Sequence, residues 1–277
     1  MQDFTNIYDS YKNKELTCGK AGRLLKVMKL ILFQLITVFI HVYFIHPSYA
    51  ITSEISKTND VVVIERKNID GYPDMIYPIV SGLSNSEVLK KVQEELSLER
   101  IWGSSIEEMI QHHGTKSMDY TINYNKNDIL DITFTKDTVT AYYRNHIVYK
   151  TINLKNGDPL KAIDLFKPEM LPSLLGRLKN LQKKEFQQAL FSLADSEDEL
   201  NRYSRADLEE ELLKREYKLI EDLDNFSIND QGVVFIYQYE FPNVILCYEP
   251  KGKFFLSYAQ LKPYININGP LGLFVKP

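Results

Sequence analysis

Histidines are the residues best suited to chemistry in this chain, but their spacing assembles no metal site. Beyond residue 50 they are His112, His113 and His146. Adjacent side chains point apart on a strand and lie about 100° apart on a helix, and no third ligand follows His112-His113 at metal spacing. We therefore expect this pair to face solvent, and we predict neither a metal nor a cofactor.

Other catalytic signatures are equally absent from the sequence. No serine lies in a nucleophile turn, and no glycine-rich phosphate loop or Asp/Asn-rich calcium loop occurs. Paired carboxylates such as Glu107-Glu108, or Asp128 with Asp131, have polar neighbours, so nothing indicates the apolar pocket that acid catalysis requires. Cys247 lies in an apolar run with no flanking cation, which predicts a buried structural thiol. The sequence thus favours a protein that is not an enzyme.

The strand predicted around residue 146 offers the best candidate binding surface. With a period of two, Tyr142, Arg144 and His146 share one face, together with Val148 and Lys150. Neither face of this strand is cleanly apolar, so we expect one side to be exposed. An exposed tyrosine beside an arginine is typical of protein and glycan interfaces, whereas packing of the tyrosine in the core is the alternative. Tyr142, Arg144 and His146 are therefore the candidate ligand-binding residues.

Strands and a helix in the first half of residues 51–277 must position this face. We expect extended segments at residues 61–66 and 75–80, with Pro78 placing the second at a sheet edge or a strand end. Ser84 and Glu87 predict a capping box, and the helix behind it has an apolar residue at every fourth position. These helix residues are Val88, Val92 and Leu96.

A change of period from Tyr120 onward predicts an antiparallel meander. Residues 130–135 alternate strictly between apolar and polar, which indicates one buried face, with Ile132 and Phe134, and one wet face. Lys136-Asp137 is expected to form a turn into a long return strand at 139–154.

Helices are expected over residues 168–222, followed by further strands. Ser204 and Asp207 predict the cap of a second helix. Strands are expected at 232–239, 244–248 and 254–256, with a last helical turn at 258–261. Strand runs and helix runs are segregated along the chain, so the predicted class is α+β, with an antiparallel sheet and segregated helices.

Composition and charge exclude several classes of protein. The chain has 277 residues, of which 25% are charged and 44% apolar, and this rules out a disordered tail, a collagen-like fibre and a polytopic membrane protein. Residues 51–277 carry 27 Lys and Arg against 34 Asp and Glu, with no basic block. A domain this acidic is a poor partner for nucleic acid, and none is predicted.

A basic start followed by an apolar run predicts a signal peptide at residues 28–50. Residues 30–45 contain no charged side chain, and Ser48 and Ala50 occupy the −3 and −1 positions of a signal-peptidase site. We expect cleavage after Ala50 and export to the periplasm or the extracellular space. The alternative is an uncleaved signal-anchor in the cytoplasmic membrane, with residues 1–27 on the cytoplasmic side.

The chain is therefore divided into four parts. Residues 1–27 are a leader or, if translation starts at Met28, an extension that is not translated. Residues 28–50 are the signal peptide. Residues 51–165 form an N-terminal part with strands, a helix and the meander, and residues 166–277 form a C-terminal part with helices and antiparallel strands.

Several segments resemble the motifs of one family of exported domains. They are residues 77–83, 151–160 with 164–166, 226–237 and 255–261. This pattern is similar to the domain of unknown function outside the membrane in sigma-V-type anti-sigma factors, which also precedes the catalytic domain of some peptidoglycan deacetylases. The resemblance covers roughly residues 60–265 and implies a non-catalytic sensing or binding module in the cell envelope. Where the family has small residues with Ala-His, this chain has Arg144-Asn145-His146.

These observations predict a non-enzymatic, exported cell-envelope module that binds or senses a protein or glycan ligand. Its expected partner is an envelope protein or a peptidoglycan-type glycan, and it contacts the membrane only through residues 28–50 if these are not removed. One alternative is a membrane-anchored sensor whose residues 1–27 bind a cytoplasmic partner. Another is an unrecognised envelope hydrolase, which a buried cluster of His, carboxylate and Ser would favour.

Overall fold

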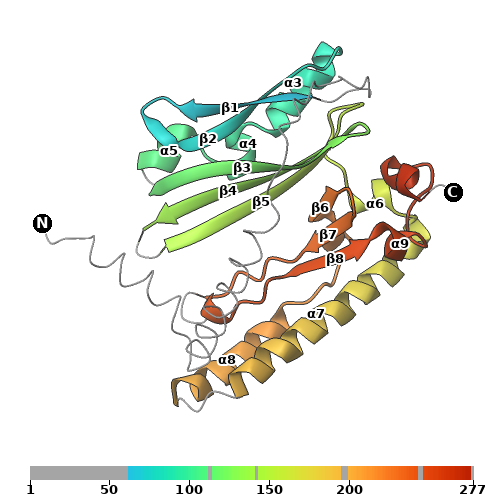
Figure 1. Cartoon of the computed structure of the whole chain (residues 1–277). Coiled ribbons are helices and arrows are strands. Elements are labelled where there is room, and N and C mark those ends of the chain that lie inside the picture. Colours follow the sequence, from blue (N-terminus) through green and yellow to red (C-terminus); the bar gives the residue numbers. More distant parts are fainter. Residues whose placement is uncertain (1–61, 112–113, 141–142, 195–198, 243–245, 276–277) are drawn as a thin grey trace, which may run out of the picture. The chain divides into compact units, whose positions relative to one another are not determined.

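The computed structural model describes residues 62–111, 114–140, 143–194, 199–242 and 246–275 (Figure 1). The described residues of 62–193 and 202–275 belong to one compact unit. The strands are β1 (Val63–Ile69), β2 (Tyr72–Ser81), β3 (Thr115–Lys126), β4 (Ile129–Val139), β5 (Tyr143–Asn153), β6 (Phe226–Asn229), β7 (Gly232–Ile236) and β8 (Lys253–Ser257). The α-helices are α3 (Ser86–Glu95), α4 (Leu98–Trp102), α5 (Ile106–Gln111), α6 (Ala162–Leu165), α7 (Leu171–Ala194), α8 (Glu199–Lys214) and α9 (Tyr258–Leu261). The 3₁₀ helices are η1 (Pro168–Met170), η2 (Ile220–Asp224), η3 (Leu246–Tyr248) and η4 (Pro270–Phe274).

These strands form two sheets, and the predicted α+β class is confirmed. The larger sheet has the order β1-β2-β3-β4-β5 and the smaller has the order β6-β7-β8. All neighbouring pairs are antiparallel except β2 and β3, which pair in parallel at Met75 and Met118. The three helices α3, α4 and α5 lie between β2 and β3 in the chain, as a parallel connection requires.

Pro78 does not lie on an edge strand, contrary to the sequence prediction. It pairs with Arg66 of β1 in the middle of β2, which has strand neighbours on both sides. Proline is tolerated at this position because β2 pairs with β3 only at Met75, so the strand needs no hydrogen bond toward β3 at Pro78.

The cap of helix α3 also differs from the prediction. Asn85 is the N-cap, and its side chain accepts hydrogen bonds from the backbone N–H groups of Glu87 and Val88. Asparagine caps a helix as well as serine does, so the start of the helix is one residue later than the Ser84 box implied. The buried stripe is confirmed, with Val88, Val92 and Leu96 packed against the larger sheet.

The meander β3-β4-β5 is confirmed, but its turn is not at Lys136-Asp137. Strand β4 continues through both residues to Val139, and β5 begins at Tyr143. Ile132 and Phe134 are buried on one face, as expected. Asp131, which falls on the face predicted to be wet, is fully buried as well because β6 covers that part of the sheet.

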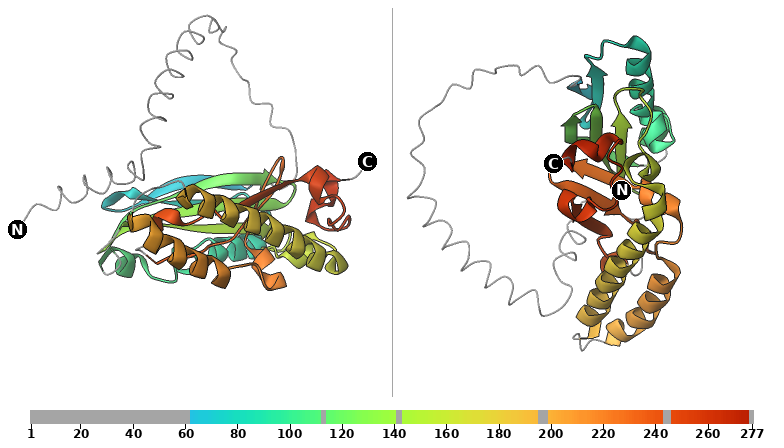
Figure 2. Two further views of the ribbon diagram at one scale, coloured as in Figure 1. Left: turned by 90° about the horizontal axis from the view of Figure 1, so that it is seen from below. Right: turned by 90° about the vertical axis from the view of Figure 1, so that its right-hand side faces the viewer.

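The C-terminal half packs a helical hairpin against the smaller sheet. Helices α7 and α8 run side by side and antiparallel to each other (Figures 1 and 2). Helix α8 begins at Glu199, so Ser204 lies inside it and is not its cap. Residues 246–248 form the 3₁₀ helix η3 in place of the predicted strand, whereas the strands predicted at 232–239 and 254–256 correspond to β7 and β8. The short strand β6 was not predicted.

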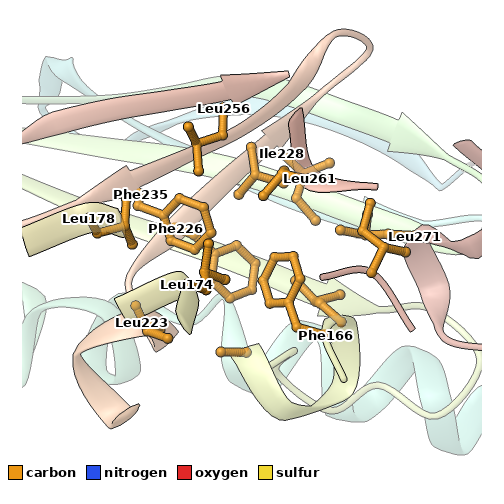
Figure 3. Close-up of a cluster of buried hydrophobic side chains, with 14 of the residues drawn as sticks. Phe166, Leu174, Leu178, Leu223, Phe226, Ile228, Phe235, Leu256, Leu261 and Leu271 are labelled. Carbon is orange, nitrogen blue, oxygen red and sulfur yellow. The ribbon is translucent and has the colours of Figure 1, made fainter. Parts of the chain in front are cut away.

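The largest cluster of buried side chains joins α7 to the smaller sheet (Figure 3). Leu174 and Leu178 of α7 are buried beside Phe226 of β6 and Phe235 of β7. A second cluster lies between α3 and the larger sheet and contains Phe134. The five-strand sheet is therefore covered by α3 on one face, while its other face meets β6 at Asp131.

Several sequence predictions lie outside the described residues. These are the signal peptide at 28–50, the leader at 1–27, the His112-His113 pair, Tyr142 and the side chain of Cys247. Across the part of the chain that the structure describes, no helix is both long enough and apolar enough to cross a membrane. The division into parts at residue 165 stays a prediction.

Candidate functional site

The candidate residues Arg144 and His146 lie near the start of β5. Arg144 is paired with Thr138 and His146 with Lys136 across the β4–β5 ladder. Phe134 pairs with Val148 in the same ladder, and because side chains alternate along a strand, Arg144 and His146 share the face that carries Phe134 and the α3 helix. Arg144 is exposed and His146 is half-buried.

The side chain at the centre of this strand end is Lys136, which the sequence analysis had placed in a turn. Lys136 is only 7% exposed. Its Nζ atom lies 4.5 Å from the centroid of the Trp102 ring, at the end of α4. Gly103, with a φ of 67°, ends α4 directly after Trp102 and so fixes where the indole is presented. An ammonium over an indole face is a cation–π contact.

Two threonine hydroxyls belong to the same face of the sheet as Lys136. A hydrogen bond of 3.0 Å joins Thr138 Oγ1 to His146 Nε2. Thr115 of β3 is paired with Thr138 and shares its face. Within the described residues, neither the buried Thr115 Oγ1 nor the buried Trp102 Nε1 has a hydrogen-bond partner. We call Trp102, Thr115, Lys136, Arg144 and His146 the strand-end cluster.

Burial and mutual repulsion shape the titration of this cluster. Burial lowers the pKa of Lys136 below that of a lysine in water. Burial also lowers the pKa of His146, and the positive charges of Lys136 and Arg144 lower it further, while Asp137 opposes the shift. His146 is therefore neutral at pH 7, and Lys136 and Arg144 supply the positive charge.

The opposite face of the same strand end is acidic. Asp137 accepts hydrogen bonds from Ser117 Oγ at 2.8 Å, Tyr143 Oη at 2.6 Å and Asn145 Nδ2 at 2.8 Å. Desolvation would raise the pKa of Asp137, but these three hydrogen bonds and the nearby His146 hold it below its usual value. Ser117 bonds to Asp137 while His146 bonds to Thr138, so Ser117 and His146 do not form a serine–histidine pair of the kind that activates a nucleophile.

A second polar cluster lies further along β4, around Asp131. Its carboxylate accepts hydrogen bonds from Thr151 Oγ1 at 2.5 Å, Asn123 Nδ2 at 2.7 Å, Ser227 Oγ at 2.7 Å and the Ile228 backbone N–H at 2.9 Å. Burial raises the pKa of Asp131, and the hydrogen bonds oppose this rise only in part. The donors come from β3, β5 and β6, so this carboxylate ties the smaller sheet to the larger one.

An open pocket of about 280 Å³ lies along β2. Apolar residues from β2, α3, α4 and α5 dominate its wall, namely Tyr77, Pro78, Ile79, Val80, Leu96, Leu98 and Ile106. Gln93 contributes a polar group, but its amide donates to the Val80 carbonyl at 2.9 Å. Ser97 and Glu99 also line this pocket, whose wall is otherwise apolar.

Metal ligation finds no support in the described ranges, where no group of three or more His, Cys, Asp or Glu side chains could hold an ion.

The sequence predicted Arg144 and His146 as site residues from strand periodicity, and the structure places them beside each other. It missed Lys136, Trp102 and Thr115 because each comes from a different element and no local spacing links them. Only the alternation of β4, continued past Thr135, could have indicated that Lys136 points to the same face as Phe134.

Comparison with other proteins gives similarity at the level of structure alone. No family model and no curated protein matches the sequence. A DUF3298 family member from Bacteroides fragilis is similar to the chain with a TM-score of 0.42 and 12% identity, over 79% of this chain and 96% of that one. A DUF3298 family protein from Pseudomonas aeruginosa has a TM-score of 0.43 and 9% identity, over 76% of this chain and 95% of that one. Neither similarity assigns a function to this chain, and the link to anti-sigma factors and deacetylases stays a prediction.

Proposed function

We propose that this protein is a non-enzymatic, exported module of the cell envelope that binds a protein or glycan ligand at the strand-end cluster. The observation that carries the proposal is the placement of two cationic side chains, Lys136 and Arg144, on the face of the sheet that also carries the hydroxyls of Thr115 and Thr138, with the indole of Trp102 against Lys136. Aromatic and arginine side chains together with hydrogen-bond donors are typical of ligand-binding surfaces.

The arrangement supports binding more than catalysis. Catalysis by a general base or a nucleophile requires those groups to be in hydrogen-bond reach of each other. In the strand-end cluster, the hydrogen bond of His146 goes to Thr138, which is in turn within 3.4 Å of the Arg144 carbonyl oxygen. His146 and Thr138 are therefore engaged with each other and not with a nucleophile, while Lys136, Thr115 and Trp102 keep donors for a ligand among the described residues, which suits binding better than acid–base chemistry.

Capture of envelope components tests the proposal. The tagged full chain is used as bait against envelope proteins and against peptidoglycan, beside the double variant Arg144→Ala/His146→Ala. We expect the variant to lose about tenfold or more in capture, as for hot-spot side chains, with an unchanged melting curve. Arg66→Ala is the matched control, because Arg66 is also an exposed strand arginine, and it forms an ion pair with Asp119 and lies over the Tyr120 ring on β3, away from the strand-end cluster. Equal capture by the double variant and the parent would place the site elsewhere.

Export is tested separately. Protein sequencing of the envelope fraction is expected to find an N-terminus at Ile51, because Ser48 and Ala50 occupy the −3 and −1 positions of the predicted signal-peptidase site. A full-length N-terminus in the membrane fraction would instead favour the anchored sensor with residues 1–27 in the cytoplasm.

A further inference from the structure

The charge state of Lys136 is unusual for a side chain so well buried. Lysine is almost never fully buried unless it is paired. Here the residue is 7% exposed, and the described residues supply no ion pair for its ammonium. The electron-rich face of the Trp102 ring lies against the ammonium, and it compensates the positive charge of Lys136 only in part.

Lys150 of β5, on the same face of the larger sheet, shows how the charge of a lysine is compensated by an ion pair. Lys150 Nζ lies 3.8 Å from Glu95 Oε2, and Glu95 Oε1 lies 3.4 Å from Arg100. The Glu95 carboxylate therefore compensates the charges of Lys150 and Arg100. At the level of Lys136, the cross-strand neighbours on this face are His146, which is neutral at pH 7, and the cationic Arg144, so β5 supplies no carboxylate to Lys136.

Two further donors at this site also lack acceptors. The Nε1–H of Trp102 and the hydroxyl of Thr115 are buried, and within the described ranges nothing accepts from them or donates to them. A buried donor without an acceptor costs about 1–3 kcal/mol. Three donor groups without an acceptor among the described residues therefore belong to one face of the sheet. The Lys136 ammonium and the Thr115 hydroxyl come from neighbouring positions of the β3–β4 ladder, and the Trp102 indole lies against Lys136.

We infer that the strand-end cluster captures a carboxylate group of its ligand, with the Lys136 ammonium as the charge partner and the Trp102 indole N–H and Thr115 hydroxyl as further donors. This inference rests on the proposed function and deepens it by naming the ligand chemistry. A carboxylate supplies one negative charge, which matches the single buried ammonium, and two oxygens for the neighbouring donors. A phosphate dianion would bring a second charge, whereas Lys136 is the one buried cation of the cluster and Arg144 lies exposed at its rim.

The side chains at the rim of the site are not fully buried. His146 and Trp102 are half-buried, and Arg144 is exposed at the end of the strand. An exposed arginine at the rim of a buried lysine attracts an anion from solution and so favours its entry.

The chain has a single tryptophan, so its indole signal reports on this site without assignment work. The full chain labelled with ¹⁵N is titrated with sodium acetate against sodium chloride at equal ionic strength, and the indole ¹H–¹⁵N peak is followed. We expect a saturable shift with acetate alone, because the indole N–H gains an acceptor. The shift should require about tenfold more acetate in Lys136→Met and stay near the parent value in Arg66→Ala.

The outcomes separate cleanly. No saturable acetate shift, or the same titration curve for Lys136→Met and the parent, would overturn the inference. A shift with inorganic phosphate but not with acetate would overturn the assignment to carboxylate. Should Lys136→Met lose the dispersed spectrum of a folded protein, Thr115→Val provides the second test, since it removes a donor while keeping the size and is expected to weaken the acetate response severalfold.

The source of the carboxylate is identified in the same assay. An N-acetylated dipeptide with a free C-terminus represents protein ligands, and a uronic acid represents acidic glycans. A tighter response to either one supports carboxylate capture and selects the source, while a response to neither, with acetate also silent, would contradict it. Because the indole assay contains no envelope fraction, its result stands apart from the capture experiment, so failure of the inference and failure of the proposed function are distinguishable.

Discussion

Asp131 and Lys136 are two buried ionisable side chains on one strand, five residues apart and on opposite faces of the same sheet. Asp131 receives four hydrogen bonds from three neighbouring strands. Lys136 has an aromatic ring above it and, among the described residues, no carboxylate. A satisfied buried charge is part of the fold, because its removal leaves its partners without acceptors. An uncompensated one contributes little to the fold, so its retention is better explained by a ligand.

The largest expected effect is the loss of the Asp131 carboxylate. Asp131→Ala should lower the free energy of unfolding by about 3–5 kcal/mol, because it leaves buried donors on Thr151, Ser227 and the Ile228 backbone without acceptors. Urea unfolding measures this change. Asp119→Ala is the control, since Asp119 lies on the adjacent strand and forms an exposed ion pair with Arg66, worth about 1 kcal/mol or less. Equal losses in both variants would mean that Asp131 does not join the sheets.

Removal of the Phe134 ring should have a comparable cost on the other face of β4. Phe134 is 2% exposed, and Phe134→Ala should cost about 3–5 kcal/mol of unfolding free energy through loss of buried area and a cavity. The neighbouring Thr133→Ala should cost about 1 kcal/mol or less, because Thr133 Oγ1 accepts one hydrogen bond from Asn123. If the two variants unfold at the same urea concentration, the assigned register of β4 is wrong.

The two charges should also give pH dependences of opposite sign. The pKa of Asp131 is raised in the folded state, so the folded protein holds this proton to higher pH than the unfolded one, and stability falls as pH rises from about 4. The pKa of Lys136 is lowered, so the unfolded chain binds more protons, and stability rises with pH until about 10. The difference in unfolding free energy between the parent and Asp131→Asn, and between the parent and Lys136→Met, measures each slope. Slopes of the same sign would contradict the comparison.

Local sequence patterns predicted much of the framework. The period of two in β4 placed Ile132 and Phe134 correctly, and the spacing of apolar residues placed α3. Patterns of this kind depend on residues that are close in the sequence, so they can be recognised without knowledge of how the elements pack together.

What the sequence could not predict depends on contacts between distant segments. Asp131 was expected on a solvent-exposed face, because nothing in residues 130–135 indicates that β6, nearly a hundred residues later in the chain, covers that face. Lys136-Asp137 has the composition of a turn, yet β4 continues through it because β3 and β5 supply partners on both sides. The members of the strand-end cluster Trp102 and Thr115 likewise meet Lys136 only through the tertiary fold.

The smallest expected change in stability is also the most direct test of the central claim, that Lys136 is retained for binding and not for the fold. The measurement is the urea unfolding free energy of Lys136→Met. Methionine keeps the apolar length of the side chain and removes the buried charge, so the free energy should be unchanged or higher than that of the parent. A loss of about 3–5 kcal/mol, as large as that expected for Asp131→Ala, would show that Lys136 is a structural residue and would contradict the account.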